Sequence, residues 1–215
     1  MTFSAVLIDM DGTLIDSEPQ WLESETELMK RFGYDWTPAD QTYCLGGPLT
    51  KVGVYMHSLV NQESPEFFTN TLIALTEEKL AITLNFMPGA LELVDELNEL
   101  GIPMALVTAS PRNLMRAALS ALPFEYFTVA ISGEDVKRTK PDPEGYLKAA
   151  KQLSVPISEC LILEDSLTGV TAALDSGAFV LGIPHFVKLP DHAHLRVIST
   201  LDGMSATDLL NFSFD

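Results

Sequence analysis

The stretch VLIDMDGTLIDSEP, residues 6–19, determines how the rest of the chain is interpreted. Apolar residues run directly into Asp9 and Asp11, which only Met10 separates. The apolar run is typical of a buried strand, and a carboxylate at the end of such a strand is costly unless a cation compensates it. The stretch therefore raises the question of which positive charge these two acids meet.

Short apolar runs like the first recur along the chain, and helical patterns separate them. The expected strands are 5–9, 104–108, 160–164 and 179–183, with 128–132 as a weaker fifth. The expected helices are 88–101, 110–122, 142–153 and 165–177, with Ser110 capping the second and Asp165 or Ser166 capping the fourth. Continuous apolar strands alternating with helices predict an α/β fold, a doubly wound parallel sheet covered on both faces.

The segment 17–83 interrupts this alternation and contains no convincing strand. We expect three helices there, roughly 18–32, 48–62 and 65–82, with a Gly-Gly-Pro turn at 46–48. The predicted domains are therefore an α/β core, 1–16 and 84–215, and a small helical insert, 17–83.

The last stretch, 184–215, is poorly periodic and receives no functional interpretation. It contains His185, His192 and His194, which lack the regular spacing of ligands on a helix. We expect them to lie in a surface loop rather than in a metal site.

The composition excludes several classes of partner. With 30 acidic and 13 basic residues the formal net charge is −17, which argues against binding to nucleic acid or to an anionic membrane. No apolar run approaches the length of a membrane span, and the N-terminus lacks the basic region of a signal peptide. Cys44 and Cys160 are far apart and form no metal-binding motif, which favours the reducing cytoplasm. The oligomeric state is not specified, and a monomer is compatible with the sequence.

Polar residues gather where the predicted strands end. The first strand ends at Asp9–Thr13, the second at Thr108–Ser110 and the fourth at Glu164–Asp165, while Lys140 precedes the helix after the weaker strand. In an open α/β sheet ligands bind outside the carboxyl ends of the strands, so we expect these groups to share one crevice. Several carboxylates in one place need a cation, and oxygen ligands favour Mg2+.

The same groups are suited to phosphoryl transfer. The lysine, the hydroxyl and the backbone N–H groups of the Met10–Gly12 turn would hold a phosphoryl group. One carboxylate can attack phosphorus to form an aspartyl-phosphate, and a second carboxylate two residues later can protonate the leaving alcohol and then deprotonate water. Residues at i and i+2 leave a strand on the same side, which makes this arrangement possible.

Four segments together resemble the motifs of the haloacid dehalogenase superfamily of phosphohydrolases, in the order of that family. They are DMDGTLIDSEP (9–19), LVTAS (106–110), KPDP (140–143) and LEDS (163–166). The insert is similar to the cap of the β-phosphoglucomutase-like subgroup. The resemblance implies a Rossmann-like core and a cap that closes over the site and whose loops set specificity.

The resemblance also implies a role for each matching residue. Asp9 would be the nucleophile and Asp11 the general acid and base. Thr108 would bind the phosphoryl group, and Lys140 would neutralise it and orient Asp9. Mg2+ would be held by Asp9, the Asp11 backbone carbonyl and Asp165, with Glu164 beside it. The full set expected to bind substrate is Met10, Gly12, Thr108, Ala109, Ser110 and Lys140.

Three alternatives within this resemblance differ in their chemistry. A departing halide needs no proton, so Asp11 favours phosphate chemistry over dehalogenation. Mutases of the subgroup carry a histidine where this chain has Trp21, and an arginine in the cap loop, where YCLGGPLTKVG (43–53) offers only Lys51. We therefore favour a phosphatase acting on a small phosphomonoester such as a sugar phosphate, with a phosphosugar mutase as the alternative. A non-catalytic phosphometabolite-binding protein is a third possibility, although no motif residue is missing.

The substrate itself is not named by the sequence. We expect residues near Trp21, Leu45–Thr50 and Met56 in the insert to shape the substrate pocket.

Overall fold

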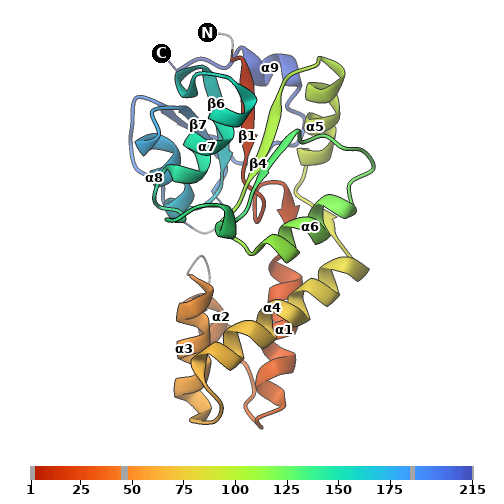
Figure 1. Ribbon diagram of the computed structural model, residues 1–215, viewed down its shortest axis with the longest axis vertical. Helices are drawn as coiled ribbons and strands as arrows, with labels where there is room; N and C mark the ends of the chain where they lie inside the picture. The colour runs from red at the N-terminus through yellow and green to blue at the C-terminus, as the bar shows by residue number, and fades with distance from the viewer. Residues whose placement is uncertain (1–2, 45–47, 185–186, 215) are drawn as a thin grey trace. The chain divides into compact units, whose positions relative to one another are not determined.

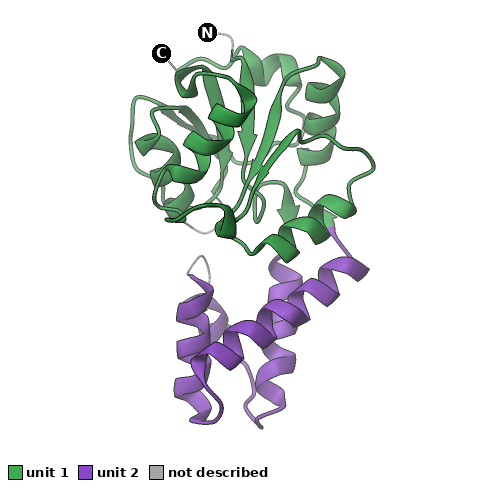
Figure 2. Ribbon diagram, in the orientation of Figure 1, with its two compact units in different colours: residues 1–16, 85–215 green, residues 17–84 purple. Residues whose placement is uncertain are grey.

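The structure is a computed structural model that describes residues 3–44, 48–184 and 187–214. The chain divides into two compact units (Figure 2). Unit 1 comprises Met1–Asp16 and Asn85–Asp215, and unit 2 comprises Ser17–Leu84. The predicted domain boundary differs from this division at Leu84, which groups with unit 2.

Unit 1 contains a six-stranded parallel sheet in the order β5-β4-β1-β6-β7-β8 (Figure 1). Its strands are β1 (Ala5–Ile8), β4 (Met104–Val107), β5 (Val129–Ile131), β6 (Cys160–Glu164), β7 (Phe179–Gly182) and β8 (Leu195–Val197). β1 lies between β4 and β6, with Leu7 opposite Ala105 on one side and Ile162 on the other. The prediction of a doubly wound parallel sheet is confirmed, and all five expected strands are present.

Helices cover both faces of this sheet (Figure 1). The helices of unit 1 are α5 (Ala90–Glu99), α6 (Arg112–Ser120), α7 (Glu144–Leu153), α8 (Leu167–Asp175) and α9 (Ala206–Leu210), with 3-10 turns at Gly133–Asp135 and Ile157–Glu159. Ala5 and Leu7 share one buried cluster with α7 and α8. Val6 and Ile8 point to the other face because successive side chains of a strand alternate, and α5 and α9 lie on that side.

The sequence prediction missed four short elements of unit 1. β8 and α9 lie in the stretch 184–215, where Arg196 interrupts the apolar pattern of an edge strand. β2 (Ile15–Asp16) and β3 (Asn85–Phe86) pair in an antiparallel ribbon directly before and after unit 2. Two-residue strands carry no periodicity that a sequence pattern can reveal.

One of the two helix-cap predictions is wrong. α6 begins at Arg112 with Pro111 at its N-cap, and Ser110 instead donates its hydroxyl to Asp11. The other holds for Ser166, whose hydroxyl accepts a hydrogen bond from the Gly169 N–H at 3.0 Å and caps α8.

Every element of secondary structure described in unit 2 is a helix. Its helices are α1 (Glu18–Lys30), α2 (Pro38–Cys44), α3 (Leu49–Val60) and α4 (Pro65–Ile82). The sequence prediction lacked α2, a seven-residue helix whose start is fixed by Asp40 accepting from the backbone N–H and hydroxyl of Thr37. Gly46 and Gly47 of the predicted turn, and Leu45 of the predicted pocket, lie outside the described residues.

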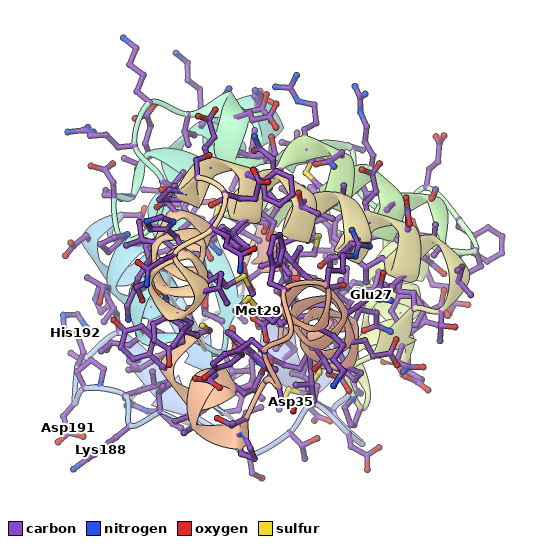
Figure 3. All side chains as sticks on the ribbon, turned by 90° about the horizontal axis from the view of Figure 1, so that it is seen from below. Glu27, Met29, Asp35, Lys188, Asp191 and His192 are labelled. Atoms are coloured by element: carbon purple, nitrogen blue, oxygen red, sulfur yellow. The ribbon has the colours of Figure 1, made fainter. Side chains whose placement is uncertain are left out.

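Met56 lies in the core of unit 2. It is 0% exposed and packs in the cluster that also contains Leu28 and Phe68, and the expectation that residues near it shape the substrate pocket stays a prediction. Trp21 is half-buried against the same cluster. Met29 belongs to this core, whereas Glu27 on the same helix is solvent-exposed (Figure 3).

The loop between β7 and β8 has two described histidines, and they differ in exposure: His192 is exposed, whereas His194 is half-buried and stacks on the Phe179 ring. Lys188 and Asp191 are exposed as well (Figure 3), and the Nδ1 of His192 accepts from the His194 N–H at 3.1 Å. His185 lies outside the described residues. Among the described helices, none combines the length and the apolarity that crossing a bilayer would take.

Candidate active site

The candidate site lies at the carboxyl ends of the central strands of unit 1. The strand order reverses direction at β1. The chain first passes through α5 and α6 to the strands on one side of β1, which are β4 and β5. It then passes through α7 and α8 to the strands on the other side, which are β6 and β7. Open α/β sheets bind ligands at such a switch point. Asp9 follows β1, Thr108 follows β4 and Glu164 ends β6, so the predicted residues meet at this edge.

Asp9 is the central carboxylate of the site. It is 6% exposed, and its backbone N–H donates to the Leu163 carbonyl at 3.1 Å, which continues the pairing of β1 with β6 past the last strand residue. Its Oδ1 accepts a short hydrogen bond from the Lys140 ammonium. The buried carboxylate therefore meets the predicted lysine.

Lys140 reaches three acceptors from the loop before α7. Besides Asp9, its Nζ donates to Glu164 Oε1 at 2.7 Å and to the Val107 carbonyl at 2.9 Å. Burial disfavours its charge, but the carboxylates of Asp9 and Glu164 outweigh burial and raise the pKa of Lys140. The lysine is therefore a fixed positive charge among acids, with all three of its donors used.

Glu164 is fully buried, and residues that sequence reasoning did not identify hold it in place. The Tyr146 hydroxyl donates to Oε1 at 2.7 Å, while the backbone N–H and hydroxyl of Ser166 lie 3.2 Å from Oε2. Gly169 makes room for the carboxylate, since a Cβ there would lie 1.7 Å from Oε1. No local pattern marks these roles, because Tyr146 and Gly169 lie on two different helices.

Three carboxylates come close enough together to hold one metal ion. One oxygen from each of Asp9, Glu164 and Asp165 lies within 4.8 Å of the others. The turn after β1 approaches Asp165 closely, with Gly12 at φ +81°, where a Cβ would lie 2.4 Å from Asp165 Oδ2. Thr13 adds a hydroxyl 3.5 Å from Asp165 Oδ1.

The protonation of this cluster fits a divalent cation. Burial raises the pKa of Asp9 well above its usual value; Lys140 opposes this, and Glu164, Asp165 and Asp11 add to it. Burial and Glu164 raise the pKa of Asp165 to about 8. One lysine is thus insufficient to keep every carboxylate ionised, and a bound cation would restore their charges. An all-oxygen donor set is the type that hard divalent ions prefer.

Asp11 is held on the other side of the site by two hydroxyl groups. Ser110 Oγ donates to Asp11 Oδ2 at 2.7 Å, and Thr108 Oγ1 lies 3.4 Å from the same oxygen. Thr108 also accepts from the Ser110 N–H at 2.9 Å, which fixes its hydroxyl. Ala109 is exposed between them. The loop after β4 therefore orients the carboxylate that lies two residues after Asp9.

The contacts described for the turn from Met10 to Gly12 mainly stabilise the turn itself. The Met10 side chain is fully buried, and its carbonyl accepts from the N–H groups of Leu14 and Ile15. The Gly12 N–H donates to the Ile15 carbonyl at 2.8 Å, so this predicted phosphate donor is already engaged.

The chain is similar in sequence to known proteins. A family model described as haloacid dehalogenase-like hydrolase matches residues 6–183. The chain is 31% identical over 185 residues to validoxylamine A 7'-phosphate phosphatase of Streptomyces hygroscopicus subsp. limoneus, covering 84% of this chain and 85% of that one. It is 31% identical over 184 residues to the phosphorylated carbohydrates phosphatase of Thermotoga maritima, with the same two coverages.

The fold is also found among solved structures. The crystal structure of CbbY from Rhodobacter sphaeroides in complex with phosphate matches with a TM-score of 0.82 and 22% identity, covering 98% of this chain and 100% of that one. At this identity the match concerns the fold. The family match over residues 6–183 shows that the chain belongs to the haloacid dehalogenase-like hydrolases.

Proposed function

We propose that this protein is a Mg2+-dependent phosphatase that hydrolyses a small phosphomonoester, a sugar phosphate, through an aspartyl-phosphate on Asp9. The observation that carries the proposal is the Asp9 carboxylate held between the Lys140 ammonium and the acids Glu164 and Asp165, with Asp11 two residues away. The substrate class is supported by the names of the two relatives, a phosphorylated carbohydrates phosphatase and a validoxylamine A 7'-phosphate phosphatase.

The first step would be attack of an Asp9 carboxylate oxygen on phosphorus. The new oxygen–phosphorus bond forms as the bond to the substrate oxygen breaks, and the leaving alcohol takes a proton from Asp11. Lys140 contacts Oδ1 of Asp9, so it orients the carboxylate and offsets negative charge as the phosphoryl group arrives. Thr108, which already bonds to the loop that holds Asp11, would donate its hydroxyl to a phosphoryl oxygen.

The second step would return the enzyme to its starting state. A water molecule gives a proton to Asp11 and attacks phosphorus, so the bond to Asp9 breaks and inorganic phosphate leaves. Asp11 thereby acts as acid and then as base, and the Ser110 hydroxyl, which donates to its Oδ2, holds it in one position for both transfers.

The chain's own residues would hold the metal ion. Asp9 and Asp165 would ligate Mg2+ directly with the backbone carbonyl of Asp11, and Glu164 would add charge beside them. When bound, the ion supplies positive charge to the phosphoryl oxygens and allows the acids to stay ionised. The free, buried thiols of Cys44 and Cys160 support a reducing compartment, and we include a cytoplasmic location in the proposal.

The test is a panel of small phosphomonoesters, hexose 1- and 6-phosphates and hexitol phosphates included, assayed for phosphate release with Mg2+. Wild-type protein releases phosphate from at least one of them, and Asp9→Asn loses turnover by several orders of magnitude. Asp191→Asn, an exposed aspartate of unit 1, is the matched control and keeps wild-type activity.

The panel also separates the alternatives. Exchange between hexose phosphate isomers without phosphate release would establish the mutase. Binding of a phosphometabolite that Asp9→Asn leaves intact, with no turnover in either protein, would establish the non-catalytic binder.

A further inference from the structure

The segment Ser132–Asp135, which follows β5 and which we call the β5 loop, is held in shape by its own hydrogen bonds. Ser132 is fully buried, and its backbone N–H and hydroxyl both donate to Asp135 Oδ2, at 2.9 Å and 2.6 Å. The Asp135 N–H donates back to the Ser132 carbonyl at 3.0 Å, and the Lys148 ammonium of α7 donates to the Asp135 carbonyl. The β5 loop is therefore a fixed support that is also tied to α7.

One contact of the β5 loop fixes Ser110, in the segment Thr108–Arg112 that follows β4 and that we call the β4 loop. The Gly133 N–H donates to the Ser110 carbonyl at 3.0 Å. The two loops approach so closely that a Cβ on Gly133 would lie 2.4 Å from the Ala109 carbonyl oxygen. The Ser110 hydroxyl is the group that donates to Asp11 Oδ2 at 2.7 Å. Ser110 therefore connects the β5 loop, through its carbonyl, with Asp11, through its hydroxyl.

A second contact fixes Arg112, at the far end of the β4 loop. Its guanidinium pairs with Asp135 Oδ1 at 2.7 Å, and its backbone N–H donates to Glu134 Oε1 at 3.2 Å. Burial disfavours the charge of Asp135, but the hydrogen bonds from Ser132 and the charge of Arg112 outweigh burial and keep the pKa of Asp135 below its usual value. Asp135 is therefore ionised at neutral pH, with one oxygen bound to its own loop and the other bound to the β4 loop.

We propose that the β5 loop, through Gly133 and Asp135, positions Asp11 as the proton donor of the reaction by holding Ser110 in place. This inference rests on the proposed function and adds to it two positioning residues that act through Ser110. A general acid is effective only within hydrogen-bond reach of the leaving oxygen, so a displaced carboxyl loses most of its effect. The alkoxide that leaves a sugar phosphate takes a proton from Asp11, whereas p-nitrophenolate is a stable anion that leaves without one.

Two variants of the β5 loop test the proposal. In Gly133→Ala the new methyl group must displace the Ala109 carbonyl. In Asp135→Asn the amide has one acceptor oxygen, which satisfies either Ser132 or Arg112 but not both. On a sugar phosphate that the wild-type protein hydrolyses, both variants should lower kcat about tenfold or more with little change in KM, as part of the roughly 10²–10⁴-fold that a positioned acid contributes.

A pair of matched esters isolates the proton transfer. Phenyl phosphate and p-nitrophenyl phosphate have nearly the same shape, but phenolate is the poorer leaving group and gains more from an acid. The ratio of kcat/KM for phenyl phosphate to kcat/KM for p-nitrophenyl phosphate should therefore fall about fivefold or more in both variants. Phosphoryl binding, the metal ion and attack by Asp9 are common to the two esters and cancel in this ratio.

Two further proteins serve as controls. Tyr126→Phe loses the hydrogen bond from the Tyr126 hydroxyl to Asp95, at the opposite end of β5 from the site, and should keep the wild-type kcat and the wild-type ratio. In a Ser110→Ala background, Asp135→Asn should have little further effect, because the hydroxyl through which it acts is gone.

The outcomes separate this inference from the proposed function. Wild-type kcat and wild-type ratio in both loop variants, or the full effect of Asp135→Asn in the Ser110→Ala background, would overturn the inference and leave the phosphatase intact. A wild-type protein that releases no phosphate from any ester would refute the proposed function, and this inference with it. Asp135→Asn decides alone if Gly133→Ala does not fold.

Discussion

The stability of the protein should depend on pH through Glu25. The pKa of this carboxyl is 4.5 in the unfolded chain and about 8 in the folded one, because unit 2 buries it near Glu18. The folded state therefore binds the proton more tightly, so the full stability is present below pH 4.5 and is lost as the pH rises toward 8. At about 1.4 kcal/mol per pH unit, the total loss is about 5 kcal/mol, of which about 4 kcal/mol falls between pH 5 and pH 9.

Glu25→Gln isolates this effect, because the amide has nearly the same shape and does not titrate. Urea unfolding of both proteins at pH 5, 7 and 9, followed by tryptophan fluorescence, reports on unit 2, where Trp21 and Trp36 lie. The free energy of unfolding of Glu25→Gln relative to wild type should rise by about 4 kcal/mol from pH 5 to pH 9. Other titrating groups cancel in this difference, and Glu23→Gln, which changes an exposed acid on the same helix, should follow wild type. A difference that changes by less than about 1 kcal/mol would refute the reasoning.

Three further predictions concern unit 1. Lys140→Met should lower the free energy of unfolding by about 3–5 kcal/mol because it leaves buried acids unpaired, and Mg2+ should recover part of this loss. Circular dichroism during denaturation checks this, with exposed Lys188→Met as control, and an equal loss in both would contradict it. Gly169→Ala should cost about 1–3 kcal/mol and weaken metal binding, since its methyl group would occupy the space of the Glu164 carboxylate. Gly145→Ala, whose nearest neighbour is a Val107 methyl group at 3.1 Å, should bind the metal normally in a calorimetric titration. Removing metal with EDTA should abolish phosphate release and Mg2+ should restore it, so full activity in EDTA would exclude the proposed metal role.

The sheet of unit 1 was largely predictable from the sequence. A parallel strand covered on both faces must be apolar throughout, so β1, β4, β6 and β7 stand out as continuous runs. β8 was missed because it lies at the edge of the sheet and carries Arg196. The short helix α2 was missed because its start depends on the local hydrogen bonds of Thr37 and Asp40, not on an apolar stripe.

The sequence predicted the main polar residues of the candidate site, but not the residues that hold them in place. Asp9, Thr108 and Glu164 follow or end strands, and the rule that parallel strands present their carboxyl ends at one edge brings them together. Tyr146 and Gly169 contact Glu164 from α7 and α8, and such contacts between distant segments leave no trace in local sequence. The burial of Met56 inside unit 2 likewise shows only in the packing of its helices.

The most direct test of the proposed chemistry is an acid quench during turnover with Mg2+ and a hydrolysed sugar phosphate, followed by mass spectrometry of the digested protein. The account predicts one phosphoryl group on the peptide that contains Asp9, and none on that peptide in Asp9→Asn. A phosphoryl group on any other peptide, or an Asp9→Asn protein that releases phosphate at the wild-type rate, would contradict it.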